Sequence, residues 1–177
     1  MARRKSLAFL DVGQGDCFVA DTKSGAIIFD GGSSSEDQVG RYRILPYMKY
    51  LGYQKIQIAV ISHMDIDHYS GIKELLEMGK IKYLGLPEIP KDDTMKKIIG
   101  IAKKRGTTIF YLSRGRQITT KDGSLKVLHP QKNSQMEKNA ASLVMQGKIL
   151  GYRVLLTGDV EKEGEEELLS EELERAD

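Results

Sequence analysis

The stretch ISHMDIDHYSG, residues 61–71, places two of the chain's three histidines and two aspartates within six consecutive positions. It continues a run over residues 56–61 that is β-branched and apolar almost throughout, which is the pattern of a central strand covered on both faces. Side chains that follow a buried strand leave the sheet at one edge, so the four polar residues are expected to converge there. Histidine and carboxylate groups in such an arrangement predict a metal site. The four candidate ligands are His63, Asp65, Asp67 and His68.

Each of these residues also has a purely structural interpretation. Asp65 or Asp67 could cap the helix expected over residues 71–78, and an isolated histidine more often serves as hydrogen-bonded scaffold than as a ligand. Capping accounts for one carboxylate and not for the whole set. A chance match to His-x-Asp-x-Asp-His-x-x-Gly in a chain of this length is expected about once in ten thousand sequences, so metal binding is the preferred interpretation.

The cysteine count and the composition limit the kind of metal site and the kind of protein. Only Cys17 is present, in an apolar strand pattern where packing explains it, so histidine and carboxylate side chains must supply metal ligands. With 40% of its residues hydrophobic, the chain is expected to form a single domain over residues 1–177. Neither an apolar run of about 18 residues nor a leader segment is present, which predicts a soluble, cytoplasmic chain.

Charge is distributed unevenly along the chain. The net charge is +2, and residues 161–177 contain nine acidic and two basic residues, a net of −7, which leaves +9 for residues 1–160. This basic body permits a polyanion such as DNA as a partner. Short basic runs such as Lys103-Lys104-Arg105 are equally typical of a solvated helix face.

Hydrophobic periodicity and turn residues predict strands and helices in mixed order. A bent strand or strand pair is expected over residues 7–20, interrupted by Gly-Gln-Gly, and a helix capped by Asp92 or Asp93 is expected to end at Arg105. The remaining expected elements are strands at 26–29, 81–86, 107–112 and 152–157, a helix over 38–51 broken at Pro46, hairpin turns at 122–123 and 146–148, and an acidic helix at the C-terminal end.

Five sequence blocks, taken in order, resemble a known family. The motif at residues 63–68 resembles the metal motif of the metallo-β-lactamase superfamily, in the variant that has aspartate in place of the second histidine. More narrowly, the chain from residue 7 to about residue 168 is similar to the metallo-β-lactamase-like domain of the ComEC/Rec2 family of competence channel proteins. The resemblance implies an α/β (α+β) fold, an αββα sandwich of two mixed sheets packed face to face between helices. The blocks are FLDVGQGD (9–16), FDGG (29–32), SHMDIDHYSG (62–71), SLV (142–144) and LLTGD (155–159).

The resemblance also implies roles for individual residues. It makes His63 and Asp65 ligands of one metal ion, and Asp67 and His68 ligands of a second. Asp159 corresponds to the carboxylate that bridges both ions, and Asp67 and Asp159 are the residues assigned to catalysis. The implied cofactors are two divalent ions, zinc or manganese. The aspartate at position 65 favours manganese, because a carboxylate is a harder ligand than imidazole.

Four further residues belong to the first two blocks. Asp30 matches a residue that lies just outside the metal ions and orients the ligand loop, and an ordinary turn aspartate is the alternative. Asp11, Gln14 and Asp16 are part of the family signature, but no physical argument makes them catalytic. Of these four residues, the resemblance assigns a supporting role at the metal site only to Asp30.

The implied activity is hydrolysis of phosphodiesters. Two cations about 3.5–4 Å apart lower the pKa of bound water and stabilise both oxygens of an in-line displacement at phosphorus. The resemblance therefore favours a metal-dependent hydrolase, a nuclease that acts on DNA during competence DNA uptake. Two alternatives stay open: an inactive domain that binds DNA or a protein partner, and a hydrolase of small esters or lactams.

Two departures from the family pattern set further expectations. The family pattern continues beyond residue 177 into a strand with another histidine ligand, so the last strand and helix of the fold are expected to be missing. The second metal site is then expected to be incomplete. A sheet edge is expected to be open, which would allow self-association. The superfamily's middle histidine is unmatched, since Asn139 and Ser142 stand in that region, and His129 is expected to be structural. Related domains are attached to a membrane channel, which would place this one at the extracytoplasmic face of the membrane.

Overall fold

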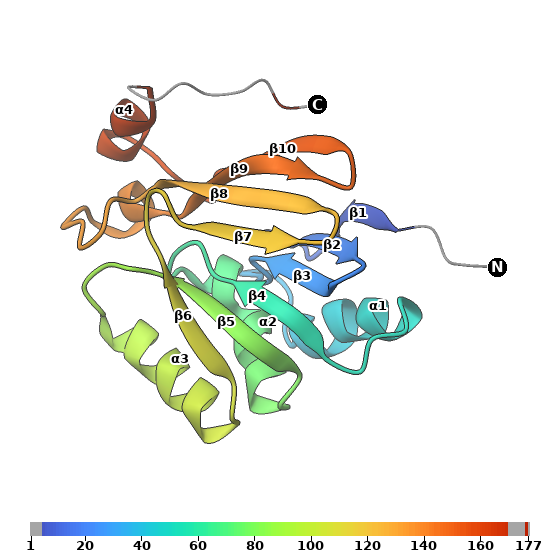
Figure 1. The fold of residues 1–177 in the computed structure, drawn as a ribbon. Coiled ribbons are helices and arrows are strands. Elements are labelled where there is room, and N and C mark those ends of the chain that lie inside the picture. The colour runs from blue at the N-terminus through green and yellow to red at the C-terminus, as the bar shows by residue number, and fades with distance from the viewer. Residues whose placement is uncertain (1–4, 170–175, 177) are drawn as a thin grey trace.

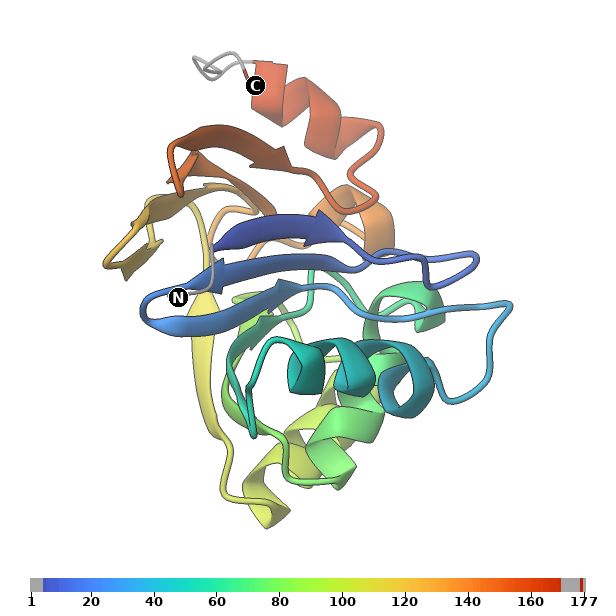
Figure 2. The same ribbon diagram turned by 90° about the vertical axis from the view of Figure 1, so that its right-hand side faces the viewer.

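Two β-sheets packed face to face form the centre of the protein (Figure 1). The computed structural model describes residues 5–169 and 176. In this part of the chain, helices pack on the outer face of each sheet, so the αββα sandwich implied by the family resemblance is confirmed. Figure 2 shows the helices of the first sheet on one side of the sandwich and the last helix on the other.

The first sheet is mixed and has the strand order β1-β2-β3-β4-β5-β6. Its first three strands are antiparallel neighbours, whereas β3 to β6 pair in parallel. Parallel neighbours need a crossover, and a helical segment links each parallel pair. The strands are β1 (Ser6–Phe9), β2 (Phe18–Thr22), β3 (Gly25–Phe29), β4 (Ile56–Val60), β5 (Ile81–Pro87) and β6 (Thr108–Leu112).

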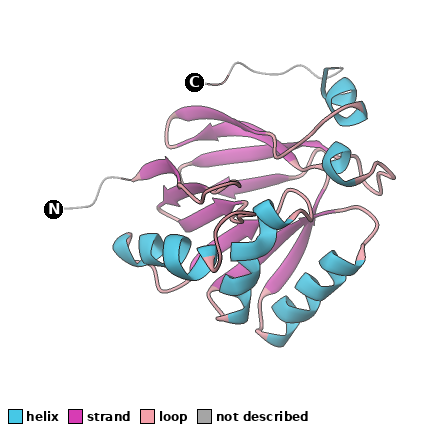
Figure 3. Ribbon diagram, turned by 180° about the vertical axis from the view of Figure 1, so that it is seen from behind, coloured by secondary structure: helices cyan, strands magenta, loops and turns pink. Residues whose placement is uncertain are grey.

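Helices cover the outer face of the first sheet (Figure 3). The expected helix over residues 38–51 forms as a π-helical turn followed by a short α-helix, and Pro46 lies in the first turn of that helix, where its missing N–H costs nothing. The carboxylate of Asp92 accepts a hydrogen bond from the backbone N–H of Met95 at 2.7 Å, which confirms the expected cap. None of the described helices combines the length and apolar character needed to cross a membrane. The helical segments of this face are η1 (Gly40–Ile44), α1 (Leu45–Tyr50), α2 (Ile66–Glu77) and α3 (Asp93–Lys104).

The second sheet has the order β10-β9-β8-β7 and is antiparallel throughout its described strands. The expectation that both sheets are mixed therefore holds only for the first. The cause is the length of the connections, because the tight turns from β7 to β8 and from β9 to β10 permit only antiparallel pairing. The strands are β7 (Gln117–Thr120), β8 (Gly123–His129), β9 (Val144–Ile149) and β10 (Tyr152–Leu156), followed by α4 (Glu163–Leu169).

Separate apolar cores hold these layers together. In β3, Ile27 and Phe29 point between the sheets and Ile28 points to the helices, so this strand is buried on both faces. The same double burial explains why β4 is apolar except at Gln57. A smaller cluster packs α4 against the outer face of the second sheet, and its buried members are Leu128, Val144 and Leu168.

Two of the expected element bounds are wrong. Helix α2 begins at Ile66 and not at residue 71, and the second hairpin turns at Leu150-Gly151 and not at residues 146–148. The expectation starts the helix at Gly71 and places Gly147 in a turn, whereas Gly71 lies inside α2 and Gly147 lies inside β9. The acidic C-terminal helix is present as α4, and residues 170–175 of that expected helix lie outside the described residues.

Candidate metal centre

The candidate ligands follow strands that end at one edge of the sandwich. Asp30 follows β3, the ligand motif follows its parallel neighbour β4, and Asp159 follows β10 of the second sheet. The backbone N–H of Leu143, just before β9, donates to the carbonyl of Ser62 at 3.0 Å. This hydrogen bond ties the second sheet to the loop that carries the motif. Loops from both sheets are thereby brought together, which is where functional side chains are expected.

His63, His68 and Asp159 form a compact group of potential ligands. One ligand atom from each lies within 4.8 Å of the other two. Nε2 of His68 is 3.2 Å from a carboxylate oxygen of Asp159, and the centroids of the two imidazole rings are 4.2 Å apart. Both histidine side chains are 2% exposed and that of Asp159 is 42% exposed, so the group meets solvent at the carboxylate.

The buried ring of His63 presents an unused nitrogen atom. Its Nδ1 lies 2.9 Å from the hydroxyl oxygen of Ser62, and its Nε2 has no hydrogen-bond partner. Burial lowers the pKa of His63, and the nearby charge of His68 lowers it further, which favours the neutral ring. With the ring proton on Nδ1 and donated to Ser62, the lone pair of Nε2 is free. A buried nitrogen of this kind, with a carboxylate oxygen of Asp65 3.7 Å away, fits a metal ligand.

Asp30 holds the ring of His68. Nδ1 of His68 lies 2.9 Å from a carboxylate oxygen of Asp30, and both side chains are almost fully buried. Burial opposes a charge on the ring, but the hydrogen bond to Asp30 and the charges of Asp30 and Asp159 outweigh it and raise the pKa of His68 to about 9. Nε2 faces Asp159 and must lose its proton before it can bind a metal ion. Metal affinity is therefore expected to fall as the solution becomes more acidic.

Asp30 uses both of its carboxylate oxygens. One accepts a hydrogen bond from the backbone N–H of Ser62 at 2.7 Å, and the other pairs with His68. Asp30 has a φ of 56°, a left-handed conformation that is costly for a residue other than glycine. These buried contacts exceed those of an ordinary turn aspartate. The role of orienting the ligand loop, which the family resemblance implies for Asp30, stays a prediction.

Glycines allow the loops to approach one another. A Cβ atom on Gly32 would lie 2.6 Å from backbone atoms at the start of α2, among them the nitrogen of His68. A Cβ atom on Gly158 would lie 2.7 Å from the hydroxyl oxygen of Ser62. Backbone and a buried hydroxyl leave no room for these atoms. The Asp-Gly-Gly and Gly-Asp sequences are therefore packing requirements of the site.

Asp65 and Asp67 lie beside the three-residue group but are not part of it. Asp65 occupies the N-cap position of α2, yet its side chain makes no capping hydrogen bond, so capping does not explain this residue. Asp67 lies in the first turn of α2, and its charge contributes to the raised pKa of His68. The assignment of both aspartates as ligands, and of Asp67 and Asp159 to catalysis, stays a prediction.

Two residues make contacts at the site that the sequence analysis does not predict. Ser62 is fully buried, its hydroxyl contacts His63, and its backbone N–H donates to Asp30. Asp16 donates its backbone N–H to the carbonyl of Asp67 at 3.2 Å. Burial raises the pKa of the Asp16 carboxyl, and the charge of Asp30 adds to the rise. Both residues lie within sequence blocks that carry the family resemblance, Ser62 at 62–71 and Asp16 at 9–16, and this position could have indicated them.

His129 is not part of the ligand group. Its ring is fully buried, Nε2 donates to the carbonyl of Ala140 at 2.7 Å, and burial lowers its pKa. These contacts agree with the structural role expected for this residue. Asn139 and Ser142, which stand where the middle histidine is unmatched, each have a buried side-chain oxygen without a hydrogen-bond partner in the described structure.

Comparison with known proteins identifies the family. Residues 10–176 match the family model described as the Metallo-beta-lactamase superfamily, and the chain belongs to this superfamily. Proteins with this fold usually bind divalent metal ions. A solved metallo-β-lactamase of Cronobacter sakazakii with a HARLDQ motif matches with a TM-score of 0.59 at 14% identity, over 89% of this chain and 61% of that one. At this identity the match shows the fold alone.

Two curated relatives narrow the resemblance. The chain is 32% identical over 179 residues to ComE operon protein 3 of Bacillus subtilis (strain 168), which covers 91% of this chain and 23% of the relative. It is 28% identical over 167 residues to Competence protein ComA of Neisseria gonorrhoeae, which covers 90% of this chain and 20% of the relative. The chain thus spans about a fifth to a quarter of the length of these relatives. The resemblance to competence proteins of the ComEC/Rec2 type is confirmed.

Proposed function

We propose that this chain is a metal-dependent hydrolase domain that cleaves phosphodiester bonds in DNA. The observation that carries the proposal is the group formed by His63, His68 and Asp159, whose ligand atoms lie within 4.8 Å of one another. Asp65 and Asp67, next to this group, are proposed to complete the coordination of manganese or zinc. The likeness to a competence protein supports DNA as the substrate.

Residues around the ligand group orient the two imidazole rings and determine which ring nitrogen carries the proton. A divalent ion bound here would polarise the substrate and lower the pKa of a bound water molecule. Ser62 and Asp30 hold Nδ1 of His63 and of His68, so that each ring offers Nε2. Asp159 is the most exposed member of the group and is therefore the one that a substrate meets first.

The test combines metal content with cleavage. Protein incubated with Mn²⁺ or Zn²⁺ is analysed for bound metal by mass spectrometry, and its cleavage of bis(p-nitrophenyl) phosphate and of single-stranded DNA is measured. Asp159→Asn should lower metal affinity or cleavage by roughly tenfold or more. Asp93→Asn is the matched control, because that carboxylate lies on α3 and is 89% exposed. Cleavage without bound metal, or equal cleavage by the two variants, would contradict the proposal.

One observation favours a second function. Among the described residues, three ligand residues gather in one group, whereas the two-ion centre expected from the sequence uses five. A single ion supports metal-dependent binding of DNA or a protein partner better than hydrolysis by two ions. One tightly bound ion per chain, with DNA binding but without cleavage of any phosphodiester, ester or lactam, would favour this function over the first.

A further inference from the structure

A pocket of about 520 Å³ opens directly beside the ligand group. His63 and Asp65 form part of its wall, and the rest comes from the loop after β5, the first turn of α3 and the segment 134–137. Pockets of this size enclose small organic groups. A group bound in this pocket would lie next to a bond cleaved at the metal centre.

The walls of the pocket are tied to each other. The backbone N–H of Asn133 donates to the carbonyl of Glu88 at 2.7 Å, and Nζ of Lys132 lies 3.0 Å from the carboxylate of Glu88. The hydroxyl of Ser113 donates to the same carboxylate at 2.9 Å. These contacts hold the segment before residue 134 against the loop after β5. The pocket is therefore formed before a ligand arrives, which reduces the entropy cost of binding.

Six of the thirteen residues that line the pocket are apolar, and three of these six are methionines. Met95 is 1% exposed, Met64 and Ile89 pack against the core between the first sheet and its helices, and Met136 lies on the segment 134–137. Methionine is flexible and polarisable, adapts to groups of different shape, and makes favourable contacts with aromatic rings. This lining can therefore accept flat aromatic rings of different kinds.

The charged groups of the pocket are acidic. Its described lining contains no lysine or arginine, but it contains the carboxylates of Asp65, Asp92 and Glu137. Asp92 accepts from the backbone N–H of Met95, so the N-terminus of α3 is already capped by a negative group. A phosphate in the pocket would be repelled by these charges. An uncharged ring with N–H donors would instead find acceptors for its hydrogen bonds.

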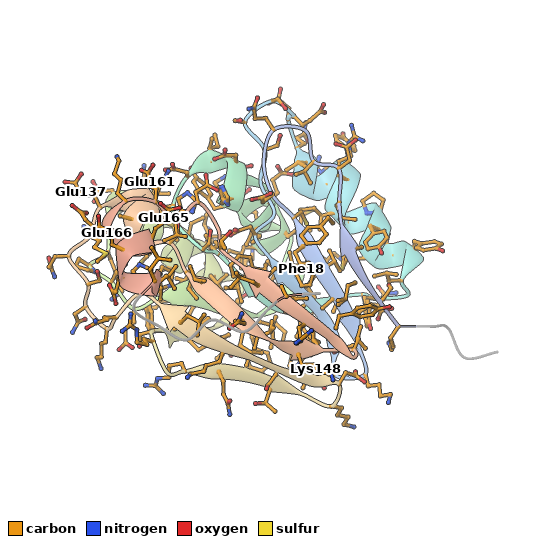
Figure 4. All side chains as sticks on the ribbon, turned by 90° about the horizontal axis from the view of Figure 1, so that it is seen from above. Phe18, Glu137, Lys148, Glu161, Glu165 and Glu166 are labelled. Carbon is orange, nitrogen blue, oxygen red and sulfur yellow. The ribbon has the colours of Figure 1, made fainter. Side chains whose placement is uncertain are left out.

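Acidic side chains continue on the neighbouring surface. Asp65 and Glu137 also border a second hollow of about 690 Å³, together with Glu161, Glu163 and one base, Lys162, whose Nζ lies 3.4 Å from the carboxylate of Glu161. Glu137 and Glu161 lie on the same side of the molecule in the view from above (Figure 4). Away from bound metal ions, these carboxylates would repel the phosphates of a nucleic acid but not its uncharged bases.

We propose that this pocket receives one nucleobase next to the scissile phosphodiester, and that the substrate is therefore an unpaired DNA strand. This inference rests on the proposed function, because the phosphodiester must lie at the metal centre. The ring packs against the methionines, and an amino group of the base donates to Glu137, as amino groups of bases do to acidic side chains. A base in a duplex can reach such a pocket only after it leaves its stack, which costs free energy.

The test compares substrates that differ in the presence or in the pairing of their bases. The full 177-residue chain, loaded with Mn²⁺, is given a single-stranded oligonucleotide, the same strand in a duplex, and an abasic strand of the same length. The single strand should be cleaved about tenfold faster than the abasic strand, within the range that one stacked base contributes. It should also be cleaved faster than the duplex. Met136→Ala should reduce the preference over the abasic strand by about threefold or more, since it removes part of the pocket lining.

Met78→Ala is the matched control, because Met78 ends α2 and is not among the residues that line the pocket. This variant should keep the wild-type preference. Equal cleavage of the normal and abasic strands by the wild-type protein would overturn the inference and leave the phosphodiesterase function in place. Cleavage of a lactam or an aryl ester with no cleavage of DNA would overturn both.

Binding provides a readout that does not depend on cleavage. Metal-free protein is titrated with a single-stranded oligonucleotide that contains 2-aminopurine, whose fluorescence changes when the base packs against protein side chains. A change that Met136→Ala weakens and Met78→Ala retains supports the pocket. Unchanged fluorescence overturns the inference whatever the cleavage result. If neither bis(p-nitrophenyl) phosphate nor DNA is cleaved, the proposed function fails, and this titration alone decides whether the pocket binds a base.

Discussion

Replacing Asp30 by asparagine removes the charge that holds His68 while the shape of the side chain is kept. In the wild-type protein the carboxylate accepts from the N–H of Ser62 at 2.7 Å and pairs with Nδ1 of His68 at 2.9 Å. An asparagine amide has one acceptor end and one donor end. With its oxygen on Ser62, its NH₂ group faces Nδ1 of His68, and the ring proton must move to Nε2. That nitrogen faces Asp159, so the ring is left in the tautomer that cannot bind a metal ion.

The size of the effect follows from the pKa of His68. In the folded, metal-free protein this pKa is raised from the ordinary 6.5 to about 9. The folded state therefore keeps a proton that the unfolded state loses near pH 6.5, and the resulting stabilisation is complete below that pH and is lost as the pH rises through about 9. At about 1.4 kcal/mol per pKa unit, this stabilisation is on the order of 3 kcal/mol at pH 6. Asp30→Asn should remove most of it and weaken metal binding by roughly 10–100-fold.

Urea unfolding of the metal-free protein and an NMR titration of the His68 ring measure these quantities. The free energy of unfolding of the variant should lie well below that of the wild type at about pH 6, and the difference should shrink by about pH 9.5. The pKa of His68 in Asp30→Asn should fall well below about 9, because burial is then opposed only by the charges of Asp159 and Asp67. The exposed Asp93→Asn serves as the control. A stability difference that is the same at both pH values, or a His68 pKa that stays near 9, would refute the reasoning.

Four further predictions concern the metal, the packing and the surface. His63→Ala combined with Asp65→Ala should abolish Mn²⁺ and Zn²⁺ binding while circular dichroism shows the fold retained, and an unchanged metal stoichiometry would remove the ligand assignment. Gly32→Ala should lower both the melting temperature and metal affinity, because its Cβ would lie 2.6 Å from backbone atoms of α2, and a wild-type melting temperature would contradict this packing argument. If the basic body of the chain meets the DNA backbone, affinity for short DNA should fall steeply with salt, and no binding at low salt would leave that charge with a role in solubility only. Phe9 and Tyr152 are 78% and 54% exposed on the edge strands β1 and β10, so sedimentation should show self-association that rises with protein concentration and that Tyr152→Lys weakens; a monomer at all concentrations would exclude it.

Local patterns predict most of the secondary structure. The apolar run at residues 56–61 predicts β4, and Asp92 predicts the start of α3, because both signals depend on near neighbours along the chain. These patterns fail at Gly71 and Gly147. A Cβ atom on Gly71 would lie 2.5 Å from the carbonyl oxygen of Gly31, and one on Gly147 would lie 2.1 Å from that of Ser124. No local rule separates a glycine that ends an element from one that admits a neighbouring backbone.

At the site, the sequence by itself determined which residues are candidates for metal binding, because so many imidazole and carboxylate groups in one short stretch have few structural explanations. Only the tertiary structure decided that His63 and His68 gather with Asp159, and that Asp65 and Asp67 lie beside them. The tertiary structure also decided how the ring of His68 is held. Asp30 is 38 positions from His68 in the sequence, and the two residues meet because they follow the neighbouring strands β3 and β4. Such a contact requires atoms to come within about 3 Å of each other. Strand pairing and the close approach of glycine-containing loops set that distance, and no spacing along the chain encodes it.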